Sequence, residues 1–471
     1  MIADLKPHSA YKDSGQDWLG SIPAHWSLLR AKRLFSEVDE RSKTGKEELL
    51  SVSHLTGVTP RRLKTVTMFM AESNVGHKVC RPGDLVINTL WAWMAALGVT
   101  RHAGLVSPAY GVYRPTDGGG ILPAYADHLL RTPMYAAEYQ RRSTGVNSSR
   151  LRLYPEQFLR TPVLVPPIDE QALIVRFLNG ANANLERMMR AKRKTIALLT
   201  EQKQAIIHRA ITGGVKAATS SRPSGVPWLG DIPQHWSVMP IKRTCTLVRD
   251  GTHLPPARTV SGFPLLSVRN MIDGRLVRRT DDSFISQADF EQLNRSFVVR
   301  PTDVLMAIVG ATLGKVAVVD DIGPFQIQRS VALLRPRADR MTASFLATFL
   351  RSPRLQQHLW QSVTFSAQPG IYLGFVANIP VPVPPTLDEQ LSICDGLQRE
   401  LAPVETAVAR LTREMDLLRE YRARLVVDIV TGKLDIRQGA ARLPEEAISD
   451  LPDAPADELD ESELTDEEAE A

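Results

Sequence analysis

The chain has 471 residues, which is too long for one ordinary domain and suggests about three. Its composition, 43% hydrophobic and 23% charged, is typical of a folded globular protein and excludes a wholly disordered chain or a collagen. No apolar run reaches the roughly 18 residues of a transmembrane helix, and the first residues lack the apolar core of a secretory leader. The three cysteines, Cys80, Cys245 and Cys394, are too far apart in sequence to indicate a disulfide framework, so we expect a cytoplasmic protein.

Charge is distributed unevenly along the chain. Residues 444–471 hold 13 Asp or Glu and no Lys or Arg, which leaves 57 basic against 39 acidic residues, a net charge of +18, on residues 1–443. A folded body this basic is typical of a protein that binds a polyanion, most often nucleic acid, although charge also serves solubility alone. The acidic tail is predicted to be disordered and to act as a solubilising segment.

The chain repeats itself at long range. Residues 18–27 read Trp-Leu-Gly-Ser-Ile-Pro-Ala-His-Trp-Ser and residues 228–237 read Trp-Leu-Gly-Asp-Ile-Pro-Gln-His-Trp-Ser, so eight of the ten positions are identical at an offset of 210. Further pairs follow in the same order with offsets of 210 to 221: Lys32-Arg33 and Lys242-Arg243, Arg81-Pro-Gly-Asp84 and Arg300-Pro-Thr-Asp303, Arg114-Pro115 and Arg335-Pro336, Arg131-Thr-Pro133 and Arg351-Ser-Pro353, Val165 to Gln171 and Val383 to Gln390, and Thr212-Gly213 and Thr431-Gly432. A period this long indicates two whole domains with their connectors rather than a solenoid.

Both copies have the same predicted layout. After the Trp- and Pro-rich opening motif come about 140 residues with short apolar runs, such as 84–87 and 304–309, which Gly and Pro interrupt as in strands and turns. A Pro-Pro pair ends this stretch, and Asp169-Glu170 or Asp388-Glu389 then favours the first turn of a helix through the helix dipole. A helix-rich segment of about 45 residues completes each copy.

The helix-rich segments carry a heptad pattern in matching register. In the second copy the seam positions are Val404, Val408, Leu411, Met415, Leu418, Leu425 and Ile429, with Arg422 as a polar exception. In the first copy they are Leu185, Met189, Lys192, Ile196, Leu199, Ile206 and Ala210, with Lys203 matching Arg422. An ordinary amphipathic core helix would show a similar period. Two matched seams in one chain favour a mutual coiled coil.

These patterns predict an α+β fold with two pseudo-symmetric α/β domains separated by two long helices that pair as an antiparallel coiled coil. We predict the first domain at 12–167, the first helix region at 168–213, the second domain at 222–385, the second helix region at 386–433 and the acidic tail at 434–471. A nearly constant frame with divergent interiors suggests one protein that binds two different targets at a fixed separation.

The sequence shows no convincing catalytic, cofactor or metal motif. The segment Gly310-Ala-Thr-Leu-Gly314-Lys315 has one residue too few between its glycines for a phosphate loop, and Val316 stands where such a loop needs Ser or Thr, so we predict a strand–turn–strand. The ten histidines show no metal-ligand spacing. His25 and His235, in the two opening motifs, are interpreted as structural residues whose hydrogen bonds hold a Trp-rich corner. A binding protein is therefore favoured over a nuclease or methyltransferase with diverged motifs.

Taken together, these motifs resemble the specificity subunits of type I restriction–modification systems. The resemblance spans roughly residues 12–434 and rests on the two opening motifs, on residues 310–316, on the segments 160–171 and 379–390 and on the two Thr-Gly pairs. It implies two target-recognition domains that alternate with two paired helical regions, and no catalysis in this chain. It also implies double-stranded DNA, two methylation subunits and restriction subunits as partners, with S-adenosylmethionine, ATP and Mg on those partner subunits and neither a cofactor nor a membrane bound here.

The resemblance further implies a bipartite, asymmetric DNA target, of which each domain reads one half. Residues 183–211 as one helix would span about 43 Å, on the order of one 34–36 Å turn of B-DNA. We therefore predict two half-sites of about 3–5 base pairs with an unread spacer between them. A non-enzymatic coiled-coil scaffold or protein-binding adaptor is the alternative function.

Candidate DNA-binding residues are polar and basic side chains in predicted loops. In the first domain they are Arg61, Arg62, Lys64, Arg101, His102, Arg141, Arg142, Asn147, Ser148 and Arg150. In the second domain they are Arg258, Arg269, Asn270, Arg275, Arg278, Gln326, Gln328 and Arg329, together with Ser366 and Gln368, where the family carries a polar loop. For each residue a solvated surface role fits the sequence as well as DNA contact does. Trp91 and Trp93, which replace an apolar run of the second copy, are predicted to lie in the core.

Overall fold

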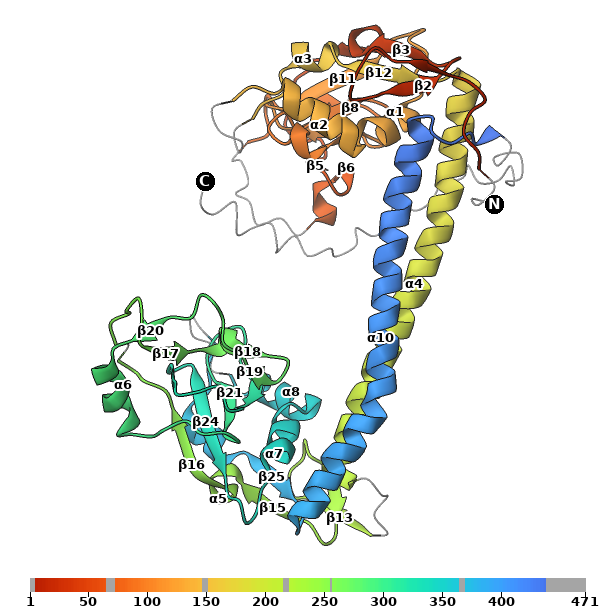
Figure 1. Ribbon diagram of the computed structural model, residues 1–471. Coiled ribbons are helices and arrows are strands. Elements are labelled where there is room, and N and C mark those ends of the chain that lie inside the picture. The colour runs from red at the N-terminus through yellow and green to blue at the C-terminus, as the bar shows by residue number, and fades with distance from the viewer. Residues whose placement is uncertain are drawn as a thin grey trace. The chain divides into compact units, whose positions relative to one another are not determined.

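Figure 1 shows the computed structural model of the chain, which describes residues 5–64, 73–145, 151–214, 220–254, 256–363 and 369–437. The chain forms two compact units. Unit 1 consists of residues 1–191 and 414–471, and unit 2 consists of residues 192–413. Among the described residues, no helix combines the length and the apolar character that crossing a membrane requires.

The centre of unit 1 is an antiparallel sheet with the strand order β4-β11-β8-β9. The apolar run after Asp84 forms β8, and all of its side chains are buried. Because side chains alternate along a strand, Leu85 and Ile87 join one hydrophobic core while Val86 joins a second core on the other face. The strands are β4 (Phe35–Glu37), β8 (Leu85–Ile87), β9 (Leu97–Val99) and β11 (Gly111–Pro115).

The sheet of unit 2 has the order β16-β24-β21-β22-β19-β18, and its first four strands repeat the order of unit 1. Only β19 and β22 pair in parallel within this sheet of described strands. The glycine-containing segment 310–315 connects the antiparallel strands β21 and β22, which confirms the predicted strand–turn–strand. The strands are β16 (Cys245–Asp250), β18 (Met271–Ile272), β19 (Arg275–Leu276), β21 (Val304–Ala307), β22 (Val316–Val318) and β24 (Val331–Pro336).

The repeated motifs form a frame of paired strands in each unit. β3 begins at the last residue of the opening motif and pairs antiparallel with β12 before the first Pro-Pro, and β15 pairs with β25 in the same way. Proline is compatible with these two-stranded ladders because each strand has a free edge. The frame strands are β1 (Tyr11–Asp13), β2 (Ser21–Pro23), β3 (Ser27–Arg30), β12 (Pro162–Val165), β13 (Ser221–Pro223), β14 (Asp231–Pro233), β15 (Ser237–Pro240) and β25 (Pro380–Val383).

Three short helices follow each sheet at equivalent places. Proline occupies the first turn of four of them, where its missing N–H leaves no helical hydrogen bond unmade. The helices are α1 (Pro123–Leu130), α2 (Pro133–Arg142) and α3 (Pro155–Leu159) in unit 1, and α7 (Ala343–Leu350), α8 (Pro353–Gln361) and α9 (Leu373–Asn378) in unit 2.

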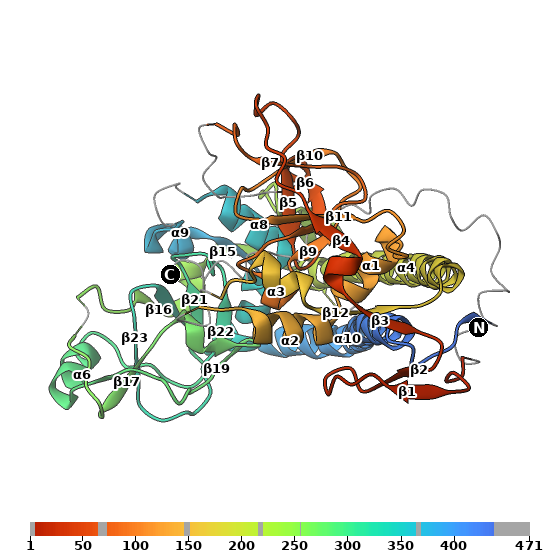
Figure 2. The same ribbon diagram turned by 90° about the horizontal axis from the view of Figure 1, so that it is seen from above.

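The insertions between the shared strands differ between the units. Unit 1 has two strand pairs, β5–β6 and β7–β10, which gather on one side of it in Figure 2. Unit 2 instead has the three-stranded sheet β20-β17-β23 and the helix α6, while its short helix α5 lies at the place of the 3₁₀ turn η1 of unit 1. Their bounds are β5 (Leu50–Ser53), β6 (Gly57–Pro60), β7 (Lys78–Cys80), β10 (Gly104–Val106), β17 (Phe263–Leu266), β20 (Phe284–Ile285), β23 (Gln326–Ile327), α5 (Ile241–Thr244) and α6 (Gln287–Asn294), with 3₁₀ turns at η1 (Ala31–Arg33), η2 (Arg61–Leu63), η3 (Ala92–Met94) and η5 (Val268–Asn270).

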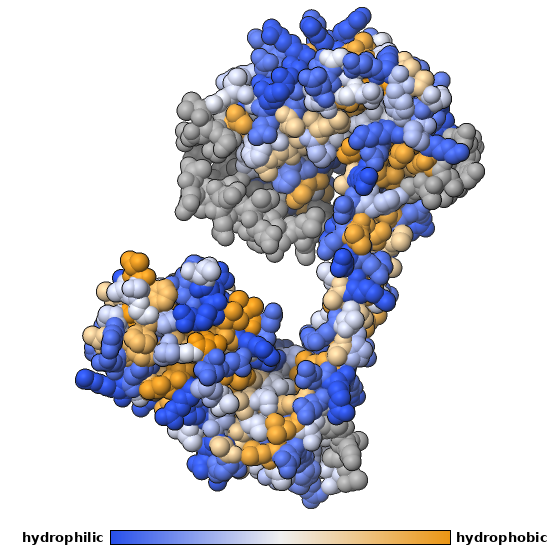
Figure 3. All heavy atoms as spheres, in the orientation of Figure 1, coloured by the Kyte–Doolittle hydropathy of each residue, from blue (hydrophilic) through white to orange (hydrophobic). Residues whose placement is uncertain are grey.

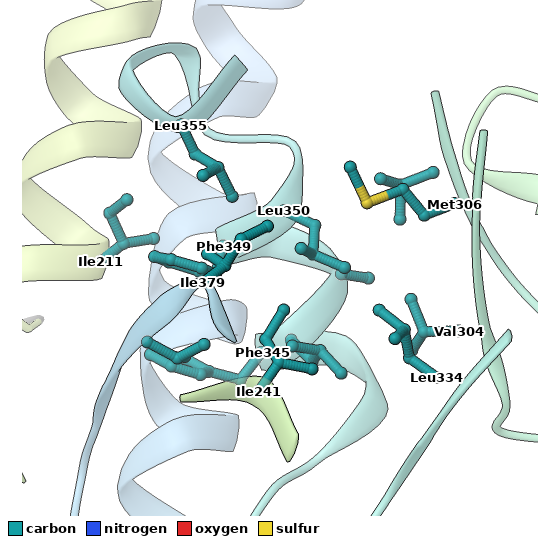
Figure 4. Close-up of a cluster of buried hydrophobic side chains, with 14 of the residues drawn as sticks. Ile211, Ile241, Val304, Met306, Leu334, Phe345, Phe349, Leu350, Leu355 and Ile379 are labelled. Carbon is teal, nitrogen blue, oxygen red and sulfur yellow. The ribbon is translucent and has the colours of Figure 1, made fainter. Parts of the chain in front are cut away.

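The main core of unit 2 joins its sheet to the long helices. Phe345 and Phe349 of α7 lie between Val304 and Met306 of the sheet and Ile211 of the first long helix (Figure 4). The corresponding core of unit 1 joins its sheet to the start of one long helix and the end of the other. Apolar burial therefore fixes each domain onto the helix pair.

The two long helices are α4 (Ile168–Gly213) and α10 (Leu387–Val430), seen side by side in Figures 1 and 2. Within unit 1 an ion pair joins Arg422 to Glu186, with 2.6 Å between Nη1 and Oε1. Within unit 2 Lys203 pairs with Glu405 at 2.6 Å and Arg209 with Glu400. The residue numbers in each pair add up to 608 or 609, so all three pairs have one antiparallel register.

The heptad seam is the buried face of this helix pair. Its apolar ends are buried, whereas the central positions apart from Met415 are half-buried and are flanked by exposed residues. The predicted α+β fold with two long antiparallel helices is thereby confirmed. The buried seam residues are Leu185, Met189, Ile206, Ala210, Val404, Met415, Leu425 and Ile429.

Each long helix ends at a glycine in the left-handed conformation. Gly432 has φ +76°, and a Cβ there would lie 2.4 Å from Pro23 of the opening motif, so only glycine fits. Gly214 has the same φ and faces Trp236 of the second opening motif. The sequence pairs Gly432 with Gly213, which is wrong by one residue because α4 continues through Gly213 before it ends.

Candidate nucleic-acid interface

One end of each central sheet is held by a buried carboxylate. Asp84 accepts the backbone N–H of Arg81 at 2.9 Å and two hydrogen bonds from the Arg114 guanidinium at 2.8 Å. Asp303 accepts the N–H of Arg300 and two 2.8 Å hydrogen bonds from Arg335 in the same way. These hydrogen bonds raise the pKa of both guanidinium groups. The repeated Arg-Pro-x-Asp motif is therefore a brace that fixes the start of β8 or β21.

At the opposite end of the sheet in unit 1, three segments meet: residues 88–91, 107–110 and 151–154. The N–H of Leu153 donates to the Thr89 carbonyl at 2.9 Å, and the Thr89 hydroxyl donates to the Ala109 carbonyl at 2.9 Å. Asn88 donates to the Tyr110 hydroxyl at 3.2 Å. We call these segments the loop corner of unit 1.

Unit 2 has the same construction in residues 308–310, 328–330 and 369–372. The N–H of Ile308 donates to the Ser330 carbonyl at 2.9 Å, and the N–H of Ile371 donates back to Ile308 at 3.0 Å. The N–H of Gly310 donates to Pro369 at 2.8 Å. These segments are the loop corner of unit 2, and each corresponds to one segment of unit 1.

Some predicted DNA-binding residues belong to these corners. Gln328 is half-buried and Arg329 is exposed in the middle segment of unit 2. Among the described residues, the Arg329 side chain has no hydrogen bond or ion pair, so its charge is available to a ligand. Five further predicted DNA-binding residues lie outside the described residues: Asn147, Ser148, Arg150, Ser366 and Gln368.

Of the three basic residues after β6, one lies near the loop corner of unit 1. Burial raises the pKa of Tyr110, and the charge of Arg61 opposes that rise, so Arg61 lies close to the corner. Arg62 is exposed and pairs with Glu48 at 2.6 Å. Lys64 is half-buried at the end of the same 3₁₀ turn.

The remaining candidates of unit 1 lie elsewhere or carry a partner. Burial lowers the pKa of His128 on α1, and Arg101 adds to that effect, so Arg101 lies toward α1. His102 is half-buried in the same turn, where its backbone bonds to Thr100.

Two arginines on the last turn of α2 share one buried carboxylate. Arg141 and Arg142 hydrogen-bond Glu138 at 2.6–2.8 Å. Burial raises the pKa of Glu138, but these hydrogen bonds outweigh it and the pKa falls. The pair thus carries less net charge toward a ligand than its sequence suggests.

In unit 2 the predicted arginines surround an acidic pair. Arg269 pairs with Asp281 at 2.9 Å and Arg278 with the buried Asp282 at 3.0 Å. Arg275 on β19 and Arg258 before β17 are exposed, and within the described residues neither side chain has a hydrogen bond or ion pair. These two cations are the more accessible ones.

Two predicted site residues are structural instead. Asn270 is buried and donates to Asp282 at 2.6 Å and to the Val277 carbonyl at 3.1 Å. Gln326 is buried and donates to the Phe297 carbonyl at 2.7 Å and to Asn294 at 2.8 Å. Their amides are engaged inside the unit, so neither is placed to read a base. Sequence reasoning could not separate them from exposed amides because a single sequence does not reveal burial.

Sequence reasoning missed a pair of exposed tyrosines. Tyr154 precedes α3 and is 49% exposed, and Tyr372 precedes α9 and is 78% exposed. The Arg152 guanidinium lies over the Tyr154 ring, 5.7 Å from its centroid. The sequence could have indicated these tyrosines, because Leu153-Tyr154 recurs as Ile371-Tyr372 at an offset of 218. Trp91 is 36% exposed, so the prediction that it belongs to the core was wrong.

A hollow beside α3 is strongly basic in unit 1. It has a volume of about 680 Å³ and is lined by Gln16, Arg30, Lys32, Arg142, Glu156, Leu159, Arg160 and Pro162. Figure 3 shows that hydrophilic residues dominate the visible surface around this end of unit 1. The equivalent hollow of unit 2, about 450 Å³, is lined by His358, Gly374, Phe375, Asn378, Ile379 and Pro380. The same place in the fold therefore carries several positive charges in unit 1, whereas in unit 2 its lining has no Lys, Arg, Asp or Glu.

Comparison with known proteins finds similar chains of one kind. No protein-family model matches it. Over 293 residues it is 25% identical to the specificity subunit of type I restriction enzyme EcoBI from Escherichia coli, which covers 57% of this chain and 61% of that protein. Over 365 residues it is 22% identical to the EcoKI specificity subunit of Escherichia coli strain K12, which covers 75% of each. The chain thus spans less than two thirds of the first relative.

A solved structure from a study of the assembly and conformational transition of the type I R-M system has the same fold. Its TM-score is 0.62 at 18% identity, over 88% of this chain and 99% of the other. Two copies of a β-rich domain, each followed by a long helix that pairs antiparallel with the other, define a tandem protein built on one helix pair. In sequence and in fold the chain is similar to the specificity subunits of type I restriction–modification systems.

Proposed function

We propose that this chain recognises the DNA target of a type I restriction–modification complex, and that each unit reads one half of a bipartite, asymmetric site. The observation that carries the proposal is the pair of loop corners. Equivalent segments meet at the same end of the same sheet in both units, but they present different side chains. A common support with different loops is what two unlike half-sites require.

The loop corners offer suitable chemistry for DNA. Arg61, Arg152 and Tyr154 in unit 1, and Gln328, Arg329 and Tyr372 in unit 2, lie in or beside them. Arginine and glutamine can make paired hydrogen bonds to base edges, and arginine also binds phosphates. The net charge of +18 on residues 1–443 supports the phosphate contacts that supply most of the affinity.

In this proposal the chain is non-catalytic and works in the cytoplasm. Two methylation subunits would bind S-adenosylmethionine and methylate adenine, and restriction subunits would use ATP and Mg. This chain would place them on the DNA. The helix pair would fix the distance between the two domains, which leaves the bases between the half-sites unread.

The test is a map of modified bases in genomic DNA. The chain is expressed with its methylation subunit in a host that lacks such modification, and the control omits this chain. We expect N6-methyladenine at one split motif that disappears in the control. A complex that forms and binds S-adenosylmethionine but neither modifies nor binds DNA would overturn the proposal in favour of a scaffold.

A further inference from the structure

Three side chains that are far apart in sequence meet in the frame of unit 1. They are His8 before β1, His25 of the opening motif and Glu170 in the first turn of α4. His25 Nε2 lies 2.7 Å from one Glu170 oxygen, and His8 Nε2 lies 4.0 Å from the other. The three donor atoms all lie within 4.8 Å of one another.

His8 is the unusual member of this cluster. Its side chain is 2% exposed, and its Nδ1 is buried without a hydrogen-bond partner among the described residues. A carboxylate oxygen of Asp435 lies 3.8 Å from Nδ1. Burying an imidazole nitrogen unpaired is costly, so the present partners do not account for this histidine.

Asp435 comes from the segment that follows α10. The Arg437 guanidinium and backbone N–H hold its carboxylate at 2.6–3.1 Å, and its N–H donates to the Lys6 carbonyl at 2.7 Å. The N–H of His8 in turn donates to the Tyr11 hydroxyl at 3.0 Å. The ring of His8 is thus fixed between two carboxylates, one facing each of its nitrogens.

The equivalent place in unit 2 shows what the frame alone requires. Glu389 accepts hydrogen bonds at one oxygen from Trp236 Nε1 at 2.8 Å and from His235 at 3.1 Å. In unit 1 the Trp26 Nε1 does not make this bond and is unpaired within the described residues. At the offset of 210, the sequence has Ala218 where unit 1 has His8. The frame of unit 2 therefore uses one histidine and one glutamate at this place. Unit 1 has the same two residues and, in addition, His8.

We propose that His8, His25 and Glu170 bind a divalent transition-metal ion of the zinc class. Two imidazoles, one carboxylate and a water form a common tetrahedral zinc set. Ligand atoms around one such ion lie about 3.4 Å apart, within the range of separations found here, so side-chain rotations alone can close the site. Asp435 would then accept a hydrogen bond from His8 Nδ1, which is the carboxylate–histidine–metal arrangement that orients such ligands.

The metal would join four segments of unit 1: the residues before β1, the opening motif, the start of α4 and the end that follows α10. It would close the frame where the two ends of the described chain meet. Unit 2 would close the same frame with the hydrogen bond from Trp236. The sequence shows no metal-ligand spacing because these ligands come from segments 17 and 145 residues apart.

The experiment is a metal titration of the untagged full-length chain after dialysis against a chelator. Calorimetry with Zn²⁺ and metal analysis of the dialysed complex give the stoichiometry, and thermal unfolding gives the stabilisation. Cysteine thiols will contribute little, because burial raises the pKa of Cys80 and Cys245 to about 12. We expect one equivalent of Zn²⁺ with a micromolar or lower Kd and a higher Tm in its presence.

Variants separate the site from nonspecific binding. His8→Ala should abolish the stoichiometric binding and the rise in Tm. Asp435→Asn, which keeps the ligands, should weaken binding about tenfold. The matched control His235→Ala in unit 2 should bind as the parent does, and circular dichroism verifies that each variant is folded. A parent chain that binds no Zn²⁺, or a His8→Ala variant that binds it equally well, would overturn the proposal.

Discussion

Units 1 and 2 have the same frame of paired strands, but the side chains that line their surface hollows differ. Gln171 and Gln390 each accept a backbone N–H at 2.8 Å and donate to two carbonyls. In contrast, the hollow beside α3 has four basic residues in its lining, whereas the one beside α9 has Asn378 in the position of Arg160. The glutamines, which hold several backbone groups, recur in both copies, while the residues that line the two hollows have diverged. Sequence repetition thus separates support from specificity.

The largest effect that we expect breaks the Asp–Arg brace. Asp303→Ala should lower the free energy of unfolding of unit 2 by about 3 kcal/mol. Arg335, which is only 20% exposed, would lose its carboxylate and keep only its hydrogen bond to the Val298 carbonyl. Asp84→Ala should cost unit 1 less, about 2 kcal/mol, since Arg114 is 34% exposed and water screens it. Hydrogen exchange in increasing denaturant, followed separately in peptides of each unit, measures both values. Equal losses of unfolding free energy in both units would show that the exposure of the arginine does not set the cost of removing its carboxylate.

Removing the repeated glutamine should have a smaller and symmetrical effect. Gln171→Ala leaves the N–H of Leu122 and two carbonyls without their partner, and Gln390→Ala does the same at Thr342. We expect a loss of about 1.5 kcal/mol in each unit. The same exchange experiment measures it. A loss confined to one unit would show that the two frames are not equivalent.

Substitution of the exposed tyrosines tests whether the two loop corners bind different half-sites. Tyr154→Ala or Tyr372→Ala should weaken DNA binding by the complex with its methylation subunit about tenfold, if each ring stacks on DNA. Titrations against duplexes mutated in one half-site assign each tyrosine to its half. Tyr421→Ala, an exposed tyrosine on α10, is the matched control and should bind normally. Unchanged binding in both variants would remove the tyrosines from the interface.

The smallest predicted effect concerns one backbone position in the brace turn. Thr302 has φ +70°, whereas the equivalent Gly83 has φ +93°, and glycine is the residue that adopts this region without strain. Thr302→Gly should stabilise unit 2 by about 0.5 kcal/mol, and Gly83→Thr should destabilise unit 1 by a similar amount. Denaturant melts of single variants measure both shifts. If Thr302→Gly destabilised unit 2, the proposal that the Thr302 backbone is strained would be wrong.

Much of the frame could be predicted from the sequence, because its residues recur. The heptad positions, the start of α4 at the Pro-Pro pair and the hydrogen-bonded role of His25 and His235 all follow from repeated local patterns. The loop corners could not be predicted in the same way. Asn270 and Gln326 have the residue types of DNA readers, but burial, which a single sequence does not reveal, makes them structural.

The proximity of His8 to Glu170 could not be predicted from the sequence either. These residues meet because the frame brings the segments before β1 and after α10 to the start of α4, and no local pattern records that contact. Tyr154 and Tyr372 could have been found from the repeat, but their exposure could not.

The most direct test of the account lengthens the helix pair and leaves both loop corners intact. Seven residues are duplicated in each helix at facing positions, 192–198 in α4 and 411–417 in α10, which preserves the heptad seam and its register. One heptad adds about 10 Å, or about 3 base pairs of B-DNA. A map of N6-methyladenine should then show the same two half-sites with a longer spacer. Unchanged spacing with full modification, or new half-site sequences, would contradict the division of labour between the frame and the loops.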